Sequence, residues 1–251
     1  MPLCKNCREE VTRKYCPNCG QKTSTGRLSL PQLIRDLPHA IFHVDKGFLY
    51  NLIQLIKRPG AAICDFLEGK RKPFFHPASY LVIALVLNYL VVKITNLHFY
   101  DTEELLHMAP LEATAIKDYD AMQWWFLEHT YIYILLAIPA SSVFLYLLFK
   151  GMKQSYNLAE AAVAVLFIIA QGVLIQTTLY MFFGWTGNGS INRTLESVNM
   201  FILVTYASNV IFQLFTPGMN KWKRIILGIV GGAGLAAVWI ASDFLLYYVL
   251  S

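Results

Sequence analysis

The chain has 251 residues, of which 56% are hydrophobic and 15% are charged. Soluble domains carry about a quarter charged residues, so this composition excludes an ordinary soluble globular protein. The formal net charge of +5 conceals an asymmetry. Residues 1–77 hold thirteen Lys or Arg against six Asp or Glu, whereas residues 98–129 hold one Lys and seven acids. Because the first thirty residues contain no apolar segment, we expect no cleavable signal peptide.

Two cysteine pairs open the chain. Cys4-Lys-Asn-Cys7 and Cys16-Pro-Asn-Cys19 are CxxC motifs separated by eight residues. Four thiolates at this spacing can close a tetrahedral shell around zinc, and a closed shell is structural rather than catalytic. The pattern therefore predicts a zinc ribbon over residues 1–27, folded by its metal because so short a head cannot bury a core. Iron is an alternative ion, and two disulfides are the alternative for a head outside a reducing compartment.

The predicted head is basic. Its cations include Arg8, Arg13, Lys14 and Lys22, but Tyr15 is its one aromatic residue. Nucleic-acid binding is poorly supported by so few aromatic side chains. We therefore expect either a basic face near anionic lipid or a cytoplasmic protein partner, and no nucleic acid.

Residues 28–77 are predicted to form an amphipathic juxtamembrane collar of short helices. Asp45 can cap one of them, in which Phe48, Leu49, Leu52, Ile53 and Ile56 form an apolar stripe opposite Asn51, Gln54 and Arg58. Another helix, over about 61–68, is expected to stop at Gly69. None is long enough to span a bilayer, and amphipathic helices with basic flanks lie in the membrane interface.

The collar also carries four candidate lipid-binding cations: Arg58, Lys70, Arg71 and Lys72. A cation close to an anionic surface gains about 1 kcal/mol, so a site for anionic lipid headgroups is one hypothesis. The alternative is a topology signal that keeps this end of the chain in the cytoplasm.

These motifs together resemble a known family. The cysteine pairs are followed by Asp45–Phe48 (DKGF), Arg58–Gly60 (RPG), Gly69–Lys72 (GKRK) and Pro77. This order is similar to that of bacterial zinc-ribbon-headed multispan membrane proteins of the domain of unknown function 3667 type. The resemblance covers roughly the first eighty residues and implies an architecture without catalytic residues. The remaining body is similar in span count to the Yip1-type five-span membrane proteins.

A helix needs about twenty apolar residues to cross a bilayer. Five predicted spans meet this length, at about 78–97, 130–149, 158–183, 197–215 and 225–250. The predicted fold is thus an all-α membrane bundle of five transmembrane helices over residues 78–251, preceded by the four-Cys zinc ribbon and the interfacial amphipathic helices.

Connector charges predict the orientation of the bundle. Lys150 and Lys153 follow the second span, and Lys221, Lys223 and Arg224 precede the fifth. Because Lys and Arg are retained in the cytoplasm, the N-terminus is expected there and the C-terminus on the opposite side. Residues 98–129 would then form an acidic outer segment, and the expected location is the bacterial cytoplasmic membrane.

Several polar side chains fall inside the predicted spans: Gln171, Asn199, Tyr206, Asn209, Gln213 and Asp243. Those of the fourth span share one helical face. One interpretation is a polar pathway between spans three to five; the other is interhelical hydrogen bonding that holds the bundle together. Gly228 and Gly232 form a GxxxG surface suited to close packing, and Asn157 and Glu160 fit a helix N-terminal capping pattern.

The sequence suggests three functions, in decreasing order of support. An enzyme is the third, because no nucleophile–base constellation, phosphate loop or nucleotide fingerprint is visible; it would be an interfacial lipid-acting enzyme using His39, His43, Asp45 or His76. The first is a non-enzymatic adaptor or scaffold whose zinc head binds a cytoplasmic partner. The second is a transporter or channel, which a homo-oligomer could also build. The molecular activity itself is not predicted.

Overall fold

The computed structural model describes residues 2–31, 33, 47–95, 97, 125, 130–186, 188–215 and 218–250. This part of the chain folds into α2 (Gly47–Lys57), α3 (Pro59–Glu68), α4 (Pro77–Thr95), α7 (Thr130–Gly151), α8 (Leu158–Phe183), α9 (Gly189–Leu214) and α10 (Lys221–Leu250), with one short 3-10 helix, η1 (Gly184–Thr186). Isolated β-bridges join Leu3 to Glu10 and Tyr15 to Lys22 in the head. The all-α prediction for the body is confirmed in these ranges.

Four of the described helices are long and apolar enough to cross a membrane. They are Pro77–Thr95, Leu158–Thr186, Gly189–Leu214 and Lys221–Ser242. In α7 the described apolar stretch is shorter, Leu136–Gly151. The chain is therefore a multi-span membrane protein, while the count of five spans stays a prediction. The predicted outer segment, 98–129, lies outside the described residues apart from Trp125.

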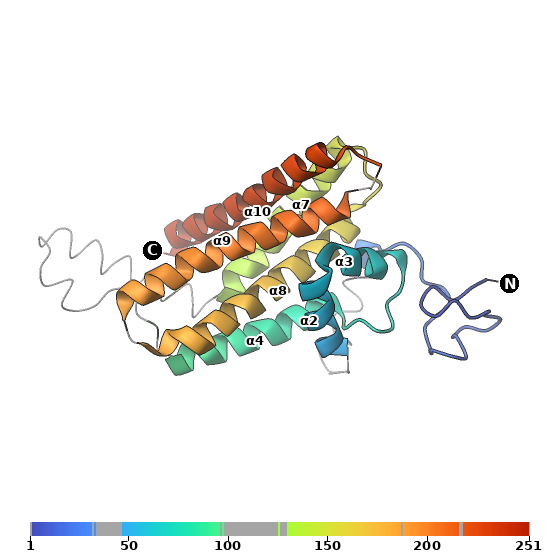
Figure 1. Ribbon diagram of the computed structural model, residues 1–251, viewed down its shortest axis with the longest axis horizontal. Helices are drawn as coiled ribbons and strands as arrows, with labels where there is room; N and C mark the ends of the chain where they lie inside the picture. Colours follow the sequence, from blue (N-terminus) through green and yellow to red (C-terminus); the bar gives the residue numbers. More distant parts are fainter. Residues whose placement is uncertain are drawn as a thin grey trace, which may run out of the picture.

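Helix α8 is the centre of the bundle. It contacts α4, α7 and α9, and α10 completes the bundle by packing on α9 and α7. In an 18-residue apolar stretch of α8, 89% of the residues are buried, against 22% in the corresponding stretches of α9 and α10. Figure 1 shows the long helices running along one axis, the head beyond α3 at one end, and the two chain termini at opposite ends.

Local capping fixes where the central helices begin. Asn157 accepts a hydrogen bond from the Glu160 amide, and the Glu160 carboxylate accepts one from the Asn157 amide, which completes the predicted capping box of α8. The Asn188 side chain likewise caps α9 by accepting from the Ile191 amide. Helix α9 therefore begins at Gly189, before the predicted span start at 197, because the cap outweighs the polar residues of its first turns.

Helix α2 differs in part from the expected amphipathic pattern, since Phe48 and Leu52 pack on the core but the rest of the apolar stripe does not. Asn51, predicted on the polar solvent face, is fully buried. Its side-chain amide donates to the Phe75 carbonyl at 3.1 Å and accepts from the Phe75 amide at 3.0 Å. Leu49, Ile53 and Ile56 are exposed instead. Asn51 is buried because it satisfies both backbone groups of a residue that precedes α4 and has no helical partner there.

The Arg-Pro-Gly motif at 58–60 starts α3 rather than only interrupting a helix. Pro59 occupies the first helical position, where its missing N–H costs nothing. Gly60 lies so close to α9 that an added Cβ would collide with the Gln213 side chain. The helix ends at Gly69, whose φ of 108° is the left-handed conformation that favours glycine. The predicted stop at Gly69 is confirmed.

The GxxxG surface of α10 packs directly on α9. A Cβ added at Gly232 would lie 2.8 Å from both the Ser208 amide nitrogen and the Val204 carbonyl oxygen. At Gly228 it would lie 2.7 Å from the Ser208 carbonyl oxygen. The two backbones can approach this closely because the glycines have no side chain, which confirms the predicted close packing.

We predict that Gly232→Ala lowers the free energy of unfolding by about 1–3 kcal/mol, because the backbone of α9 must move to admit the methyl group. The measurement is unfolding by dodecyl sulfate titration in mixed micelles. The matched control is Gly151→Ala at the end of α7, where nothing lies within 4 Å of the added Cβ. Equal effects of the two substitutions would contradict close packing at Gly232.

Candidate metal centre and its docking to the bundle

The four predicted ligands come together in the head. The sulfur atoms of Cys4, Cys7, Cys16 and Cys19 all lie within 4.8 Å of one another. The Cys4–Cys19 sulfur distance is 3.6 Å and the Cys7–Cys16 distance is 3.5 Å, well beyond a disulfide bond of about 2.05 Å. Four clustered thiols from two knuckles match the donor set of a tetrahedral structural zinc site.

The two knuckles repeat the same backbone geometry. Cys4 and Cys16 donate their amides to the carbonyls of Glu9 and Gln21, each at 2.8 Å. The residue after the second cysteine of each pair has a left-handed backbone, with φ of 63° at Arg8 and 70° at Gly20. Only the second knuckle has the glycine that this conformation favours. Arg8 is therefore a strained position of the first knuckle.

The thiols of this cluster do not ionise independently. Burial raises the pKa of Cys19, but hydrogen bonds from the Asn6 side chain and the Gln21 backbone lower it to about 6. A backbone hydrogen bond at Glu9 lowers the pKa of Cys7, but burial and the three other sulfurs raise it to about 12. A divalent cation supplies the positive charge that allows all four ligands to be thiolates. The residues therefore fit a metal ion by their chemistry as well as by their distances.

The head has almost no apolar core without the metal site. Its buried hydrophobic residues are Val11, Cys4 and Cys16, with Cys7 and Cys19 packed against them. So small a cluster cannot offset the chain entropy of about 25 ordered residues, so we expect metal binding and docking to the collar to supply the remaining folding free energy.

The head is docked on the collar through Gln21, the second residue after Cys19. Gln21 is only 3% exposed. Its side-chain oxygen accepts hydrogen bonds from the amides of Arg71 (3.1 Å) and Lys72 (3.2 Å). Beside it, Lys5 donates to the Thr25 carbonyl at 2.8 Å, and both residues pack against Gly69. The head therefore docks on the GKRK segment, residues 69–72.

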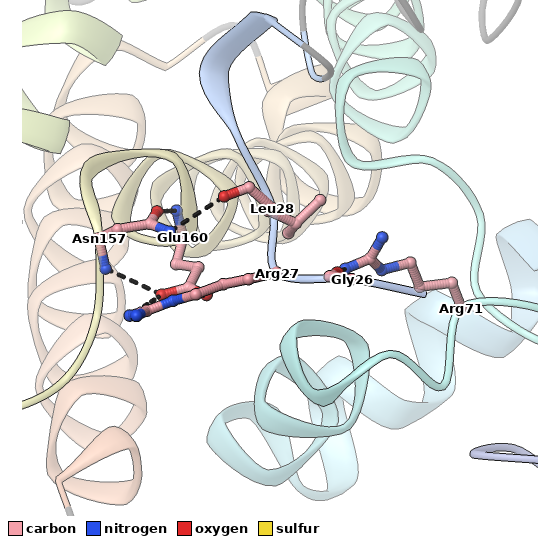
Figure 2. Close-up of polar contacts among 6 residues, drawn as sticks. All are labelled: Gly26, Arg27, Leu28, Arg71, Asn157 and Glu160. Atoms are coloured by element: carbon pink, nitrogen blue, oxygen red, sulfur yellow. Dashed lines mark hydrogen bonds and ion pairs between the residues drawn. The ribbon is translucent and has the colours of Figure 1, made fainter. Parts of the chain in front are cut away.

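A second set of contacts joins the linker after the head to α8. Arg27 forms a bidentate ion pair with Glu160, with two N–O distances of 2.9 Å. Asn157 donates its side-chain amide to the Leu28 carbonyl at 3.0 Å. Arg71 donates to the Gly26 carbonyl at 2.9 Å, so collar, linker and α8 meet at one point (Figure 2). The metal centre is therefore connected to the first turn of the central helix by consecutive side-chain contacts.

The four candidate lipid-binding cations differ in their surroundings. Arg58 and Lys70 both pair with Asp65, which Arg58 reaches at 2.9 Å. Burial raises the pKa of Asp65, but these two cations lower it below its usual value overall. Arg71 contacts the Gly26 and Phe66 carbonyls, and Lys72 is exposed. Lys72 is exposed and takes part in none of these ion pairs, and the lipid-site hypothesis stays a prediction.

The polar residues of α9 lie against the collar. The Tyr206 hydroxyl donates to the Leu55 carbonyl at 3.2 Å. Gln213 accepts from the Gly60 amide at 3.0 Å and the Ala61 amide at 3.3 Å, and donates to Asn209 at 3.1 Å. Gln213 thereby supplies the N-terminal cap that the Arg58 side chain does not give to α3.

The other predicted intramembrane residues lie elsewhere. Gln171 is buried in α8 and accepts a 2.6 Å hydrogen bond from the Tyr80 hydroxyl of α4. Asn199 is buried, and its side-chain oxygen has no hydrogen-bond partner among the described residues. The side chain of Asp243 lies outside the described part of α10. The structure therefore bonds Gln213 to Asn209 and places Tyr206 and Gln213 against the collar, while Gln171 bonds to Tyr80; the pathway hypothesis stays untested.

The sequence did not reveal the structural roles of four residues. These are Gln21, Arg27 and Asn51 as hydrogen-bond or ion-pair partners, and Gln213 as the cap of α3. Asn51 carries a signal, since it is an amide within an apolar run. Gln21 and Arg27 carry none, because their partners lie far along the chain. The histidines 39 and 43 and Asp45 lie outside the described residues, and His76 is half-buried before α4.

Comparison with known sequences identifies one region. A family described as "Protein of unknown function (DUF3667)" matches residues 45–88, from before α2 into α4. This segment includes the RPG and GKRK motifs and excludes the four cysteines, and it confirms the resemblance to that family for the collar. Neither curated proteins nor solved structures gave a match to this chain. The likeness to Yip1-type proteins and the bacterial origin are not supported by these comparisons.

We predict opposite effects of two substitutions after the cysteine pairs. Arg8→Gly relieves the left-handed strain and should slow metal loss to a chelator, whereas Gly20→Ala introduces strain of about 1–2 kcal/mol and should speed it. The measurement is the rate of zinc transfer from the purified protein to a chromogenic chelator. If both substitutions changed the rate of zinc transfer in the same direction, the shared knuckle geometry would be contradicted.

We predict that Gln21→Ala undocks the head while the metal stays bound. Two partly buried amides lose their shared acceptor, which costs about 1 kcal/mol. Hydrogen exchange at the amides of residues 71 and 72 should speed up, with the zinc content unchanged. Gln21→Glu keeps an oxygen acceptor in the same place and serves as the matched control; it should retain slow exchange. Fast exchange in both variants would show that the amides do not depend on this side chain.

Proposed function

We propose that this chain, which matches DUF3667 over its collar, is a non-enzymatic adaptor or scaffold of the bacterial cytoplasmic membrane. In this proposal five spans anchor the protein, the N-terminal head faces the cytoplasm, and the C-terminus lies on the opposite side. Support for five crossings comes from the long helices, which alternate in direction and leave the two termini at opposite ends (Figure 1). The connector cations support the orientation.

The observation that carries the proposal is the rigid attachment of the head. A head that only recruits a partner to the membrane could be joined to the bundle by a flexible linker. Here the linker is held by the Arg27–Glu160 ion pair and the Asn157–Leu28 hydrogen bond, and the head by Gln21. Such an attachment presents a partner at a fixed position relative to the bundle, which is the property of a scaffold.

The zinc ion would be held by Cys4, Cys7, Cys16 and Cys19, and its role would be to fold the head. The surface left exposed by docking includes Leu3, Tyr15 and several cations of the head. A cytoplasmic protein with an acidic surface would suit it better than nucleic acid, because aromatic side chains are scarce. Anionic headgroups near Lys72 and a second copy of the chain are further proposed partners.

Asn199 favours one other candidate function. A buried carbonyl oxygen without a partner is costly in an apolar bundle, so it marks a place where water or a polar solute could bind. The second candidate is therefore a transporter or channel with a polar path that includes Asn199. The contacts of Tyr206 and Gln213 with the collar do not favour including these two residues in that path.

Replacing Cys16 and Cys19 by Ser tests the adaptor proposal. The expected result is loss of zinc and of a reproducible cross-linked protein partner from the full-length chain in native-lipid discs, measured by mass spectrometry. Circular dichroism should show an unchanged helical bundle. The control is Asn199→Leu, which leaves the head intact and should keep the partner. A partner that survives loss of zinc, or a solute flux that Asn199→Leu abolishes, would contradict the adaptor and favour transport.

A further inference from the structure

Helix α2 presents an apolar face to the outside of the protein. Leu49 is 63% exposed, Ile53 45% and Ile56 62%. These positions are four and three residues apart, so they form one stripe along the helix. Asn51, one of the two amides of α2, is turned inward and fully buried, while the other, Gln54, is half-buried and accepts a hydrogen bond from Arg58. A helix surrounded by water has the reverse arrangement, with apolar residues inside and amides outside.

This orientation is fixed by contacts at both ends of α2. At the start, the amide of Asn51 is bonded to both backbone groups of Phe75, and the Phe48 ring lies 5.2 Å from the Tyr80 ring in the first turn of α4. Gly47 lies against the Phe75 backbone, where a Cβ would approach its nitrogen to 2.7 Å. Near the other end, Tyr206 of α9 donates to the Leu55 carbonyl. The helix therefore cannot rotate its apolar stripe inward without losing these contacts.

The same contacts give the depth of α2. Tyr80 lies in the first turn of one candidate span, and Tyr206 lies in the last third of another. Figure 1 shows α2 running across the long helices rather than along them. Eleven residues make about 16 Å of helix, too short to cross a bilayer. Helix α4, which α2 contacts through the Phe48 and Tyr80 rings, also carries exposed apolar side chains, among them Val82 and Val86.

We propose that α2 is an in-plane membrane helix whose stripe of Leu49, Ile53 and Ile56 inserts among the acyl chains of the leaflet on the head side. Lys57 follows the stripe directly and is exposed, so its charged end can reach the headgroups of the same leaflet, while Arg58 beside it is held by Asp65 and Gln54. The helix occupies area in one leaflet only, which makes it responsive to lipid packing there. This inference concerns the membrane contact of the collar and does not rest on the adaptor function.

The test is spin-label accessibility in vesicles of phosphatidylcholine and phosphatidylglycerol. A nitroxide is attached at Ile53→Cys in a Cys64→Ala background, with the four head cysteines protected by zinc. Collision with oxygen, which concentrates in lipid, is compared with collision with a water-soluble nickel chelate. Two reference positions are labelled for comparison, one expected in lipid and one in water. Phe201→Cys is at the exposed side of α9 at mid-span, and Lys22→Cys is exposed on the head.

We expect oxygen collision at Ile53 to exceed nickel collision several-fold, as at Phe201 and opposite to Lys22. Nickel collision as high as at Lys22 would overturn the proposal, because the stripe would then face water. Low collision with both reagents would also overturn it, because a protein or a second copy would then cover the stripe. Leu49→Cys and Ile56→Cys are measured separately, so failure of one variant to fold leaves the proposal testable.

Discussion

The carboxylate of Glu160 is the point on which the attachment of the head to the bundle depends. It accepts the Asn157 amide as part of the α8 capping box and also binds the Arg27 guanidinium through both oxygens. One side chain thus determines where the most buried helix begins and where the linker after the metal site is held. Glu160 is buried whereas Arg27 is exposed, so solvent screens the pair from the Arg27 side, and loss of Arg27 would leave a buried carboxylate without its cation.

A second constraint explains the polar residues of the collar. Each break between helices leaves backbone amides without helical partners, and in an apolar environment such groups must be satisfied. Side-chain amides do this at three breaks: Gln213 at the start of α3, Asn51 at Phe75 before α4, and Gln21 at residues 71–72. The collar is therefore held by three amide side chains: Gln213 from the bundle, Asn51 from the collar itself, and Gln21 from the head.

This arrangement connects the metal to the membrane. A metal ion bound by the four cysteines would stabilise the head, and with it the Gln21 acceptor at the GKRK segment and the linker that contacts α8. The segment in between, residues 45–88, is also the region that matches DUF3667. Within it, the RPG and GKRK motifs lie at the junction of the head, the collar helices and the first span.

The sequence by itself determined the class of the protein, the metal ligands and most helix boundaries. These features depend on local composition and spacing: apolar length for the spans, CxxC pairs for the zinc shell, Asn157 with Glu160 for the start of α8, and Gly69 for the end of α3. Only the tertiary structure decided which face of α2 is buried and what Gln21, Arg27 and Gln213 contact. Their partners lie 50, 133 and about 150 residues away. Helical periodicity separates polar from apolar faces, but it cannot tell whether the surroundings of a helix are water, lipid or protein, because that depends on the neighbours which the fold brings to it.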